Sequence, residues 1–407
     1  MGTVMEYNYD IEATLAYGSS SLNLSETIGS VILNHDFDKK NMPIIYLQVS
    51  LAPDQYNTLV EHAEDGNIIL TLYKYDATSN SQIKKKYISD SFSYMMTSDP
   101  NYNESLNTGS NQQFEQKDDN DAVLRATSYF SGYIALVKEE SLNNNKQLSN
   151  GIIRNTNLIS IIHKYTKHMN MVMEPIDSSH NVNISQIIIP PISTVTKLLE
   201  YLNQQYSFYS SGYRYFRDFD KTYLMSNSGK SMDLHDGSYN KVMIHICDPL
   251  EVIDSGIAME IDSANKAYII RVDANSTSMK VDQSIDKSYN SIMSVDSSGN
   301  TSKVDLNVSS HSDSTQKVQV TKVSNSNFDS ANETKAFSES AGIMLTITKS
   351  NLDSSILTPN KEYIVKNYKN NAQYDGKYIL SYKKEVLVSD GNYVISTMFG
   401  LRKVSDS

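Results

Sequence analysis

The alternation of apolar and polar residues predicts mainly β-structure in the first 150 residues. Every second residue of 44–51 is apolar, which places one apolar row on one face of a strand, and 68–75 alternates in the same way. Two further strands are predicted at 87–96 and 126–137. Between these two, residues 97–121 are rich in Asn, Gln, Asp and Ser with few apolar positions, so we expect a long mobile loop there.

Helical spacing replaces this alternation at two places before the middle of the chain. A short helix is predicted at 55–63, just after Pro53, because its apolar residues recur three and four positions apart. A second helix is predicted at 158–169 by the same spacing. Thr156 or Asn157 precedes it, and the side-chain oxygen of either residue can accept the unpaired amide protons of the first turn.

A third helix is predicted after a double proline. Pro190-Pro191 is expected to end a strand at 183–189, and Ser193 is expected to cap a helix at 194–206. An aromatic-rich block follows it as far as Leu224. The helix carries one apolar stripe that needs a partner surface, which predicts an interface helix docked beside a strand. The stripe consists of Val195, Leu198, Leu199, Leu202 and Tyr206.

The pattern returns to strands in the last part of the chain. A polar span at 273–336 interrupts them, and its sparse alternating valines predict a long extended hairpin. Asp390-Gly391 is expected to form a tight turn between the last two strands. The strands predicted in this part are 241–246, 258–261, 267–272, 342–348, 361–368, 376–382 and 393–401.

Together these elements predict a mainly β protein with an α+β insert. The order of β-structure, helices and β-structure is the one expected if two β-barrel domains flank a small helical domain. The sequence divides accordingly into a first barrel domain at 1–150, a helix-containing α/β domain at 151–237 and a second barrel domain at 238–407. The second barrel carries the polar insertion at about 273–336. A chain of 407 residues is too long for one ordinary core, which fits this division.

Charge and cysteine content restrict which cellular compartment and which binding partners fit this chain. The formal net charge is −11, and Lys84-Lys85-Lys86 is the main basic cluster, expected at a solvated hairpin tip. Tight binding of nucleic acid needs clustered Lys and Arg, so this balance argues against it. Cys247 is the single cysteine, which fits folding in a reducing compartment. We find no apolar run of membrane-spanning length and no signal-peptide pattern, so we expect assembly in a cytoplasm.

Three fragments are similar to phosphate or metal sites, but each signal is weak. Gly229-Lys230-Ser231 matches the end of a phosphate-binding loop, yet Leu224 stands where that loop requires a glycine, so a polar connector is favoured. Asp-x-Asp pairs occur at 36–38 and 218–220. Such pairs are common in turns, and neither has a third acidic partner at a diagnostic spacing, so metal binding is disfavoured.

The histidines and the thiol do not form a recognisable catalytic set. His163 and His168 are five residues apart on a predicted helix, about 500° around its axis, so they face different ways. His245 and Cys247 point to the same side of a predicted strand, but a nucleophile also needs an oriented base and an oxyanion hole. A small buried thiol is therefore favoured. The sequence predicts no catalytic, cofactor-binding or metal-binding residue.

Three parts of the chain carry a pattern known from one protein family. From Pro190 to Leu224 the chain reads PPIS, a helix, YxFYxxG, FxDFD and YL. Its end carries YDGKYIL at 374–380 and STMFxLRK at 396–403, and its beginning carries NHDFD at 34–38 and MPII at 42–45. All three parts resemble baseplate hub proteins from contractile-tailed bacteriophages. The part from Pro190 to Leu224 resembles their central domain, the end of the chain resembles the closing strands of their second tube-like barrel, and the beginning resembles their first barrel.

The resemblance implies a structural virion protein. Hub proteins of this family form homotrimers in which each subunit contributes two tube-like barrels, so that three chains form a pseudo-sixfold ring. Such a ring adapts the sixfold tail tube above to a threefold spike or tail-tip protein below, contacts other baseplate proteins and forms part of the DNA channel. DNA would pass without specific binding. The resemblance also implies a place in the phage tail baseplate, with no enzymatic activity, no cofactor and no membrane insertion.

Two other functions compete with the hub. Abundant Tyr and Asn together with polar loops suit a receptor- or glycan-binding tail protein, which predicts saturable binding to host envelope material. The 47 acidic residues leave room for a wall-degrading tail enzyme, since a glycosidase needs two carboxylates at a set separation. A ring-shaped oligomer without turnover would favour the hub over both.

Overall fold

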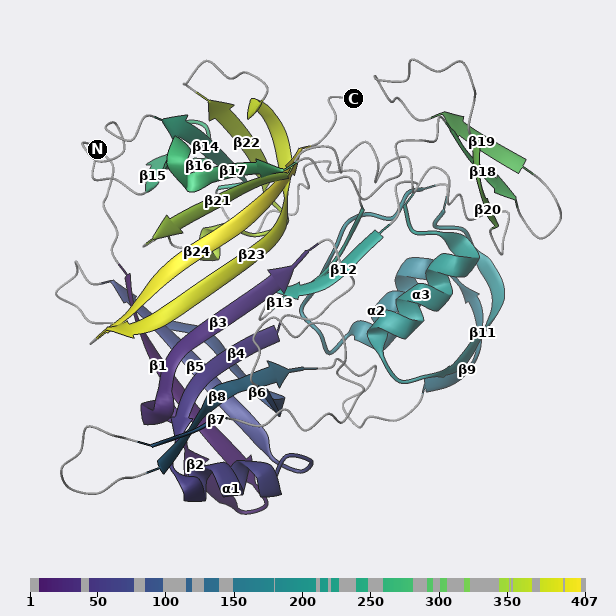
Figure 1. The fold of residues 1–407 in the computed structure, drawn as a ribbon. Coiled ribbons are helices and arrows are strands. Elements are labelled where there is room, and N and C mark those ends of the chain that lie inside the picture. The colour runs from purple at the N-terminus through teal and green to yellow at the C-terminus, as the bar shows by residue number, and fades with distance from the viewer. Residues whose placement is uncertain are drawn as a thin grey trace.

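Strands dominate the protein, and the fold is mainly β with a small helical insert, as the sequence pattern predicts (Figure 1). The structure is a computed structural model. It describes residues 7–37, 44–76, 85–97, 115–118, 128–138, 149–178, 180–209, 213–218, 221–226, 239–247, 259–280, 291–295, 301–305, 318–322, 344–350, 352, 354–367, 374–390 and 392–403. No helix in these ranges is both long and apolar enough to cross a membrane.

The first β-unit takes strands from both ends of the chain. Its strands are β1 (Tyr7–Tyr17), β2 (Ser20–Asn23), β3 (Ile28–Asp36), β4 (Ile44–Leu51), β5 (Asn67–Asp76), β6 (Lys85–Thr97), β7 (Glu115–Asp118) and β8 (Ser128–Val137), together with β23 (Gly376–Asp390) and β24 (Asn392–Lys403). The pairing order is β1-β5-β6-β8-β4-β3-β23-β24, and β24 returns to β1 through the pair Tyr9–Tyr393. This circuit surrounds an apolar cluster, the first core, which includes Ile11, Leu33, Leu47, Leu70 and Leu387.

The second β-unit shares β23 and β24 with the first. Its other strands are β14 (Lys241–Cys247), β15 (Met259–Asp262), β16 (Ala267–Asp273), β17 (Thr277–Lys280), β21 (Met344–Ser350) and β22 (Glu362–Asn367). They pair in the order β15-β16-β14-β22-β23-β24-β21-β17, and β14 runs parallel to both β16 and β22. Residues of these strands contribute most of the second core, which includes Phe37, Ile244, Val365, Leu380 and Phe399. The yellow β23–β24 hairpin in Figure 1 runs through both units.

The helical unit combines two helices with two small sheets. β9 (Ser149–Thr156) pairs antiparallel with β11 (Ile184–Ile192), while β10 (Met171–Met173), β13 (Lys221–Ser226) and β12 (Tyr213–Asp218) form the second sheet. α2 (Leu158–Thr166) and α3 (Val195–Tyr206) lie side by side, and the β9–β11 ribbon curves around them (Figure 1). The third core lies here and includes Ile161, Ile187, Leu198, Leu202 and Tyr215.

Short elements complete the described chain. α1 (Pro53–Glu61) connects β4 to β5 and places Leu59 in the first core, which confirms the short helix predicted there. Three short 3-10 segments are η1 (Ser25–Thr27), η2 (Ala274–Ser276) and η3 (Ser354–Ile356).

The predicted polar insertion holds a small sheet of its own. Its strands are β18 (Ser291–Val295), β19 (Thr301–Asp305) and β20 (Val318–Lys322). β18 lies in the middle, antiparallel to β19 and parallel to β20. The prediction of one long hairpin is therefore wrong in the described residues, because Val304 and Val320 belong to strands that flank β18 on opposite sides.

The ends of the helices and the double proline differ partly from the predictions. Asn157 caps α2, as expected, because its Oδ1 accepts a hydrogen bond from the Ser160 backbone N–H at 2.9 Å. Thr194, and not Ser193, caps α3, accepting from the Lys197 N–H at 3.4 Å. β11 also continues through Pro190-Pro191 to Ile192. An irregular register between Ile189 and Ile192 accommodates the two prolines, which cannot donate to a strand partner.

Two predictions about polar segments of the first unit are also corrected. Glu115–Asp118 forms β7 and pairs with β8, so 97–121 is not one continuous loop; residues 98–114 and 119–121 lie outside the described residues. Lys85 and Lys86 lie within β6, opposite Lys74 and Tyr73 of β5, and not at a hairpin tip, while Lys84 lies outside the described residues. The strand pairing of β5 and β6 simply extends further along the chain than the apolar alternation does.

One glycine on the shared hairpin permits a close approach of an aromatic ring. A Cβ atom at Gly400 would lie within 2.8 Å of three atoms of the Tyr382 ring, whose hydroxyl is 2.8 Å from Thr346 Oγ1. We therefore expect Gly400→Ala to lower the free energy of unfolding by about 1–3 kcal/mol through overpacking. Chemical denaturation measures this loss. In a Tyr382→Ala background, where the ring is absent, Gly400→Ala should cost clearly less; an equal cost would contradict the steric explanation.

Candidate functional site at the junction of the units

Two strands, β3 and β23, run from the first core toward the second and carry polar residues where the two cores meet. On the inner face, Leu33 of the first core and then His35 lie along β3, and Phe37 of the second core follows directly after the strand. Along β23, Leu387 of the first core is followed on the same face by Glu385 and Lys383. Because alternate residues of a strand face the same side, these polar groups form one layer between the two cores. We call His35, Lys383 and Glu385 the buried seam.

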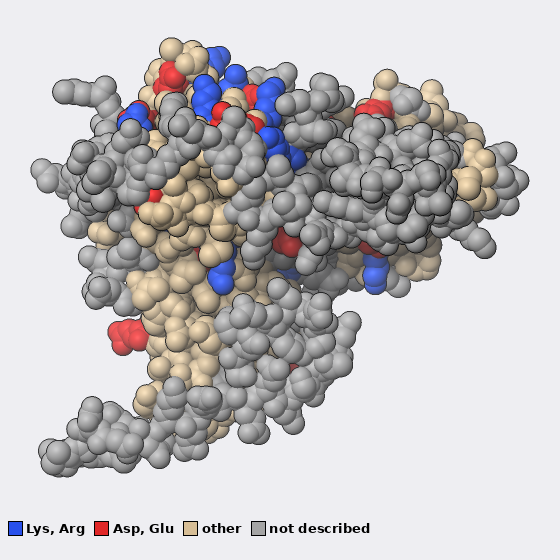
Figure 2. All heavy atoms as spheres, turned by 45° about the horizontal axis from the view of Figure 1, so that its top comes forward, with Lys and Arg blue, Asp and Glu red and all other residues tan. Residues whose placement is uncertain are grey.

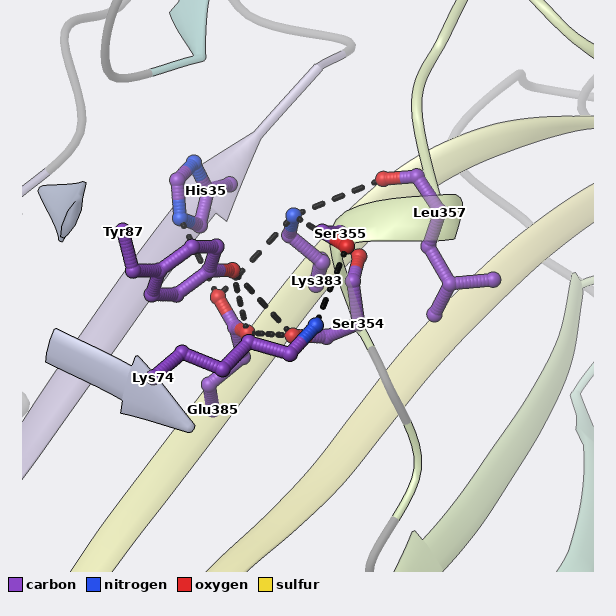
Figure 3. A network of polar contacts seen from close by, with 8 residues as sticks. All are labelled: His35, Lys74, Tyr87, Ser354, Ser355, Leu357, Lys383 and Glu385. Carbon is purple, nitrogen blue, oxygen red and sulfur yellow. Dashed lines mark hydrogen bonds and ion pairs between the residues drawn. The ribbon is translucent and has the colours of Figure 1, made fainter. Parts of the chain in front are cut away.

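The seam is an ion-pair cluster without access to solvent. The side chains of Lys383 and Glu385 are 1% and 0% exposed, and that of His35 is 0% exposed. Lys383 Nζ lies 3.9 Å and His35 Nε2 lies 3.6 Å from Glu385 Oε2. Figure 3 shows both nitrogens directed at the carboxylate. A charge buried at this depth persists only when opposite charges and hydrogen bonds surround it, and the seam supplies both.

Hydrogen bonds extend the seam to β6 and to η3. The Tyr87 hydroxyl on β6 donates to Glu385 Oε1 at 2.9 Å, and the Ser354 hydroxyl of η3 donates to the same oxygen. Lys383 Nζ donates to the backbone carbonyls of Ser354 and Leu357 at 3.5 and 3.4 Å (Figure 3). The carboxylate of Glu385 therefore connects four separate segments of the chain, namely β3, β6, β23 and η3.

Acid should weaken the seam. Burial alone would raise the pKa of Glu385, but the Lys383 ammonium, the His35 imidazole and the Ser354 hydroxyl together lower that pKa from 4.5 to about 2. Because the folded-state pKa is lower than the unfolded one, the ionised carboxylate contributes stability above about pH 4.5, and this contribution is lost as the pH falls toward about 2.

The expected loss of stability with falling pH can be tested directly. In the wild type, the denaturant concentration at the midpoint of unfolding should decrease as the pH is lowered from about 4.5 to about 2. In a Glu385→Gln variant, the same acid shift should be smaller, because the titrating group is gone. An acid shift of the same size in both proteins would show that Glu385 does not carry it.

A second ion-pair cluster attaches the helical unit to the first β-unit. Asp90 of β6 accepts from Lys138, which follows β8, and its Oδ2 accepts from Arg217 Nη2 of β12 at 3.1 Å. The three side chains are 15–33% exposed. Partial exposure lets water screen these charges, so the cluster positions β12 more than it stabilises the fold.

The hairpin of β12 and β13 belongs to two cores at once. Tyr215 and Leu224 are register partners and lie in the third core. Phe216 and Tyr223, the next pair along, lie on the other face and in the second core. The ring of Phe216 packs edge-on against Phe37, with centroids 5.0 Å apart. The aromatic block that the sequence pattern placed beside the third helix is thus the wedge between the helical unit and the second β-unit.

Local hydrogen bonds fix the turn from α3 into this wedge. Asn203 Oδ1 accepts from the Phe208 N–H at 3.0 Å, and Ser207 takes a positive φ of 50° at the helix end. The Tyr209 hydroxyl then donates to the Glu174 carbonyl at 2.7 Å, and burial, with Glu174 and Asp177 nearby, raises its pKa. The Glu174 carboxylate accepts from the Ser226 N–H at 2.6 Å and so holds the end of β13.

The residues weighed as chemical sites are not brought together. Asp36 ends β3 and Asp218 ends β12, while Asp38, Asp220 and residues 229–231 lie outside the described residues. In the part of the chain that is described, no three His, Cys, Asp or Glu side chains are grouped so that they could hold a metal ion. Cys247 is a buried thiol, as predicted, with its Sγ 3.5 Å from the His245 carbonyl oxygen.

Residues 1–404 match the family described as Bacteriophage PBS1 gene 109 protein. The chain belongs to this family. No curated protein matches the sequence.

Solved structures show that this PBS1 gene 109 family protein has the fold of phage tail proteins. A tail protein from Neisseria meningitidis MC58 superposes with a TM-score of 0.52 at 10% identity, covering 97% of each chain. The 43 kDa tail protein of prophage MuSo2 from Shewanella oneidensis superposes with a TM-score of 0.51 at 9% identity, covering 96% of each chain. Coverage of nearly the whole of both chains means that the likeness includes both β-units and the helical unit.

The sequence pattern did not reveal the seam of this family member. One signal was present, because Lys383 and Glu385 occupy the same strand face as Leu387 within the strand KYILSYKKEVLVSD. Charged residues in line with an apolar face indicate either a solvent-exposed strand end or a buried ionic layer. The pairing of β23 with β3, which places His35 opposite Lys383, shows that these charged residues form a buried ionic layer.

Proposed function

We propose that this protein is the central baseplate hub of a contractile phage tail and adapts the sixfold tail tube to a threefold spike. The observation that carries the proposal is the pair of β-units fused through one shared hairpin. Three copies of a chain with two such units supply six positions around a ring, which matches the symmetry of a tube, while the three chains match the symmetry of a spike. Family membership and the fold of tail proteins support it.

The proposal gives each part of the molecule a role. The buried seam and the β12–β13 wedge hold the two β-units and the helical unit in one fixed arrangement, which an adaptor needs because its two ends must keep different symmetries in register. The tail tube protein would bind one end of the ring, and a spike or tail-tip protein the other, with further baseplate proteins around it. The net charge of −11 suits a channel wall that DNA passes without sticking. We expect no enzymatic turnover and no bound cofactor, and a location in the virion after assembly in the host cytoplasm.

Light scattering combined with negative-stain imaging of the purified full chain tests the proposal. We expect three times the mass of one chain and a ring with a central opening. A solid threefold rod or knob would contradict the hub and favour the receptor- or glycan-binding function, for which glycan binding would be the next measurement. Hydrolysis of cell-wall material that is lost on mutating one or two carboxylates would contradict the hub in favour of an enzyme.

A further inference from the structure

The second β-unit contains a short parallel sheet whose outer face is only partly covered. β14 lies between β16 and β22 and is parallel to both. Parallel strands in proteins are almost always covered on both faces, and their sequences read as near-continuous apolar runs. The inner face of this sheet packs on the second core through Ile244, Ile270 and Val365. We therefore expect a further surface to cover the outer face as well.

An apolar row crosses this outer face. Met243 of β14 is the register partner of Ile269 on β16 and of Ile364 on β22, so the three side chains stand side by side. All three are partly exposed. Outward-facing positions of a strand that meets water are normally polar, so a row of three large apolar residues across three strands indicates a contact surface.

A basic row lies next to the apolar row. Two residues further along, His245 is the register partner of Arg271 and of Lys366. Burial lowers the pKa of His245, and the charges of Arg271 and Lys366 lower it further, against an opposing effect of Glu260. The local field at this row is therefore positive, although Arg271 also pairs with Glu260 at 3.1 Å. Figure 2 shows Lys and Arg side chains gathered at the top of the molecule, with a few acidic ones among them.

Acidic and basic side chains border the apolar row on its other side. Glu362 of β22 lies 3.9 Å from Lys241 Nζ and 3.1 Å from Lys377 Nζ. The face is thus an apolar centre between a basic row and a mixed-charge row, the arrangement of a protein–protein contact with a dry centre and a polar rim. Nucleic acid fits less well, because Glu260 and Glu362 flank the row and phosphate binding needs clustered cations.

We propose that the outer face of β14, β16 and β22 is an interface with a second copy of this chain. Charge complementarity favours this occupant: the face presents a basic row, whereas the chain carries 47 acidic against 36 basic residues, so that a second copy offers more acidic than basic side chains to pair with the row. The contact is between different surfaces of the two copies, which is the type of interface that closes rings. The inference rests on the homotrimer of the proposed function and assigns one of its contact faces.

Met243→Asp tests this assignment. A carboxylate placed at the centre of the contact would be buried without a partner, so the association constant of the full chain should fall about a hundredfold or more. Sedimentation or light scattering over a range of concentrations measures the fall. The matched control is Met398→Asp, because Met398 lies on the outward face of antiparallel β24 and is 38% exposed. The control should associate like the wild type.

A second variant covers the case in which Met243→Asp does not fold. Lys366 is exposed, so Lys366→Glu should leave the fold intact and weaken association, and the weakening should be smaller at high salt. If the wild type and both variants form the same oligomer, the face is wrongly assigned while the proposed hub survives. If the wild type stays monomeric at all concentrations, the homotrimer itself fails. Binding of DNA that Lys366→Glu abolishes would overturn the assignment in favour of nucleic acid.

Discussion

Replacing Lys383 with methionine should lower the free energy of unfolding by about 3–5 kcal/mol, because it leaves the Glu385 carboxylate buried without its ammonium partner. Methionine has nearly the length of the lysine stem, so the change removes charge and little volume. The Glu385 side chain has 0% exposure, and it would either stay charged at a high cost or take up a proton. Chemical denaturation at neutral pH measures the loss.

The neighbouring lysine provides the control for this change. Lys384 is partly exposed and faces away from the seam, since it is the register partner of Met398 and Asn34 on the outer side of the sheet. Lys384→Met should therefore alter stability by only a few tenths of a kcal/mol, as surface changes usually do, staying within about 0.5 kcal/mol. Equal losses in Lys383→Met and Lys384→Met would show that the seam is not the ionic junction inferred from its geometry.

A double replacement separates the charge from the packing. When both members of a buried ion pair are exchanged for apolar residues, stability often recovers. Lys383→Met combined with Glu385→Leu should accordingly be more stable than Lys383→Met alone. The double variant would still lack the hydrogen bonds that Tyr87 and Ser354 make to the carboxylate, so recovery to the full wild-type value is not expected.

Local pattern predicted most of the separate elements but not how they combine. The strand at 44–51 coincides with β4, and the third helix, predicted at 194–206, is α3 with an end that differs by one residue. β3 was not predicted as a strand. Its Val31 and Leu33 face the first core, while Ile32 lies in a small cluster on the opposite face, and burial of both faces removes the alternation that identifies a strand.

The shared hairpin is the feature that no local pattern contains. The sequence predicts a strand at 376–382, but β23 continues to Asp390, and only its pairing with β3 shows that its second half belongs to the first β-unit. The same holds for the seam, where Tyr87 and Glu385 meet although they are 298 residues apart in the chain. The limits predicted at 150/151 and 237/238 stay predictions, and β23, β24 and the β12–β13 hairpin each contribute to two cores.

Leu198→Asp should disrupt the helical unit. Leu198 is 0% exposed in the third core, and a carboxylate buried there without a partner costs several kcal/mol, which is a large part of the stability of a typical domain. Because the β12–β13 wedge shares Tyr215 and Leu224 with the third core, the loss should spread to the contact between the helical unit and the second β-unit. Hydrogen exchange should show increased rates in α2, α3 and β13, and the variant should not assemble.

An aspartate one residue earlier tells whether burial is the cause. Lys197 is exposed and lies in the first turn of α3, where a negative charge interacts favourably with the helix N-terminus, so Lys197→Asp should fold and assemble like the wild type. Leu202, also 0% exposed in the third core, one turn further along the same stripe, should respond like Leu198 when changed to Asp. If Leu198→Asp and Leu202→Asp both assembled normally, α3 could not be the docking element that its apolar stripe indicates. Comparing these two buried positions with the exposed control therefore separates the effect of burying a charge in the apolar stripe from the effect of adding a charge to the helix.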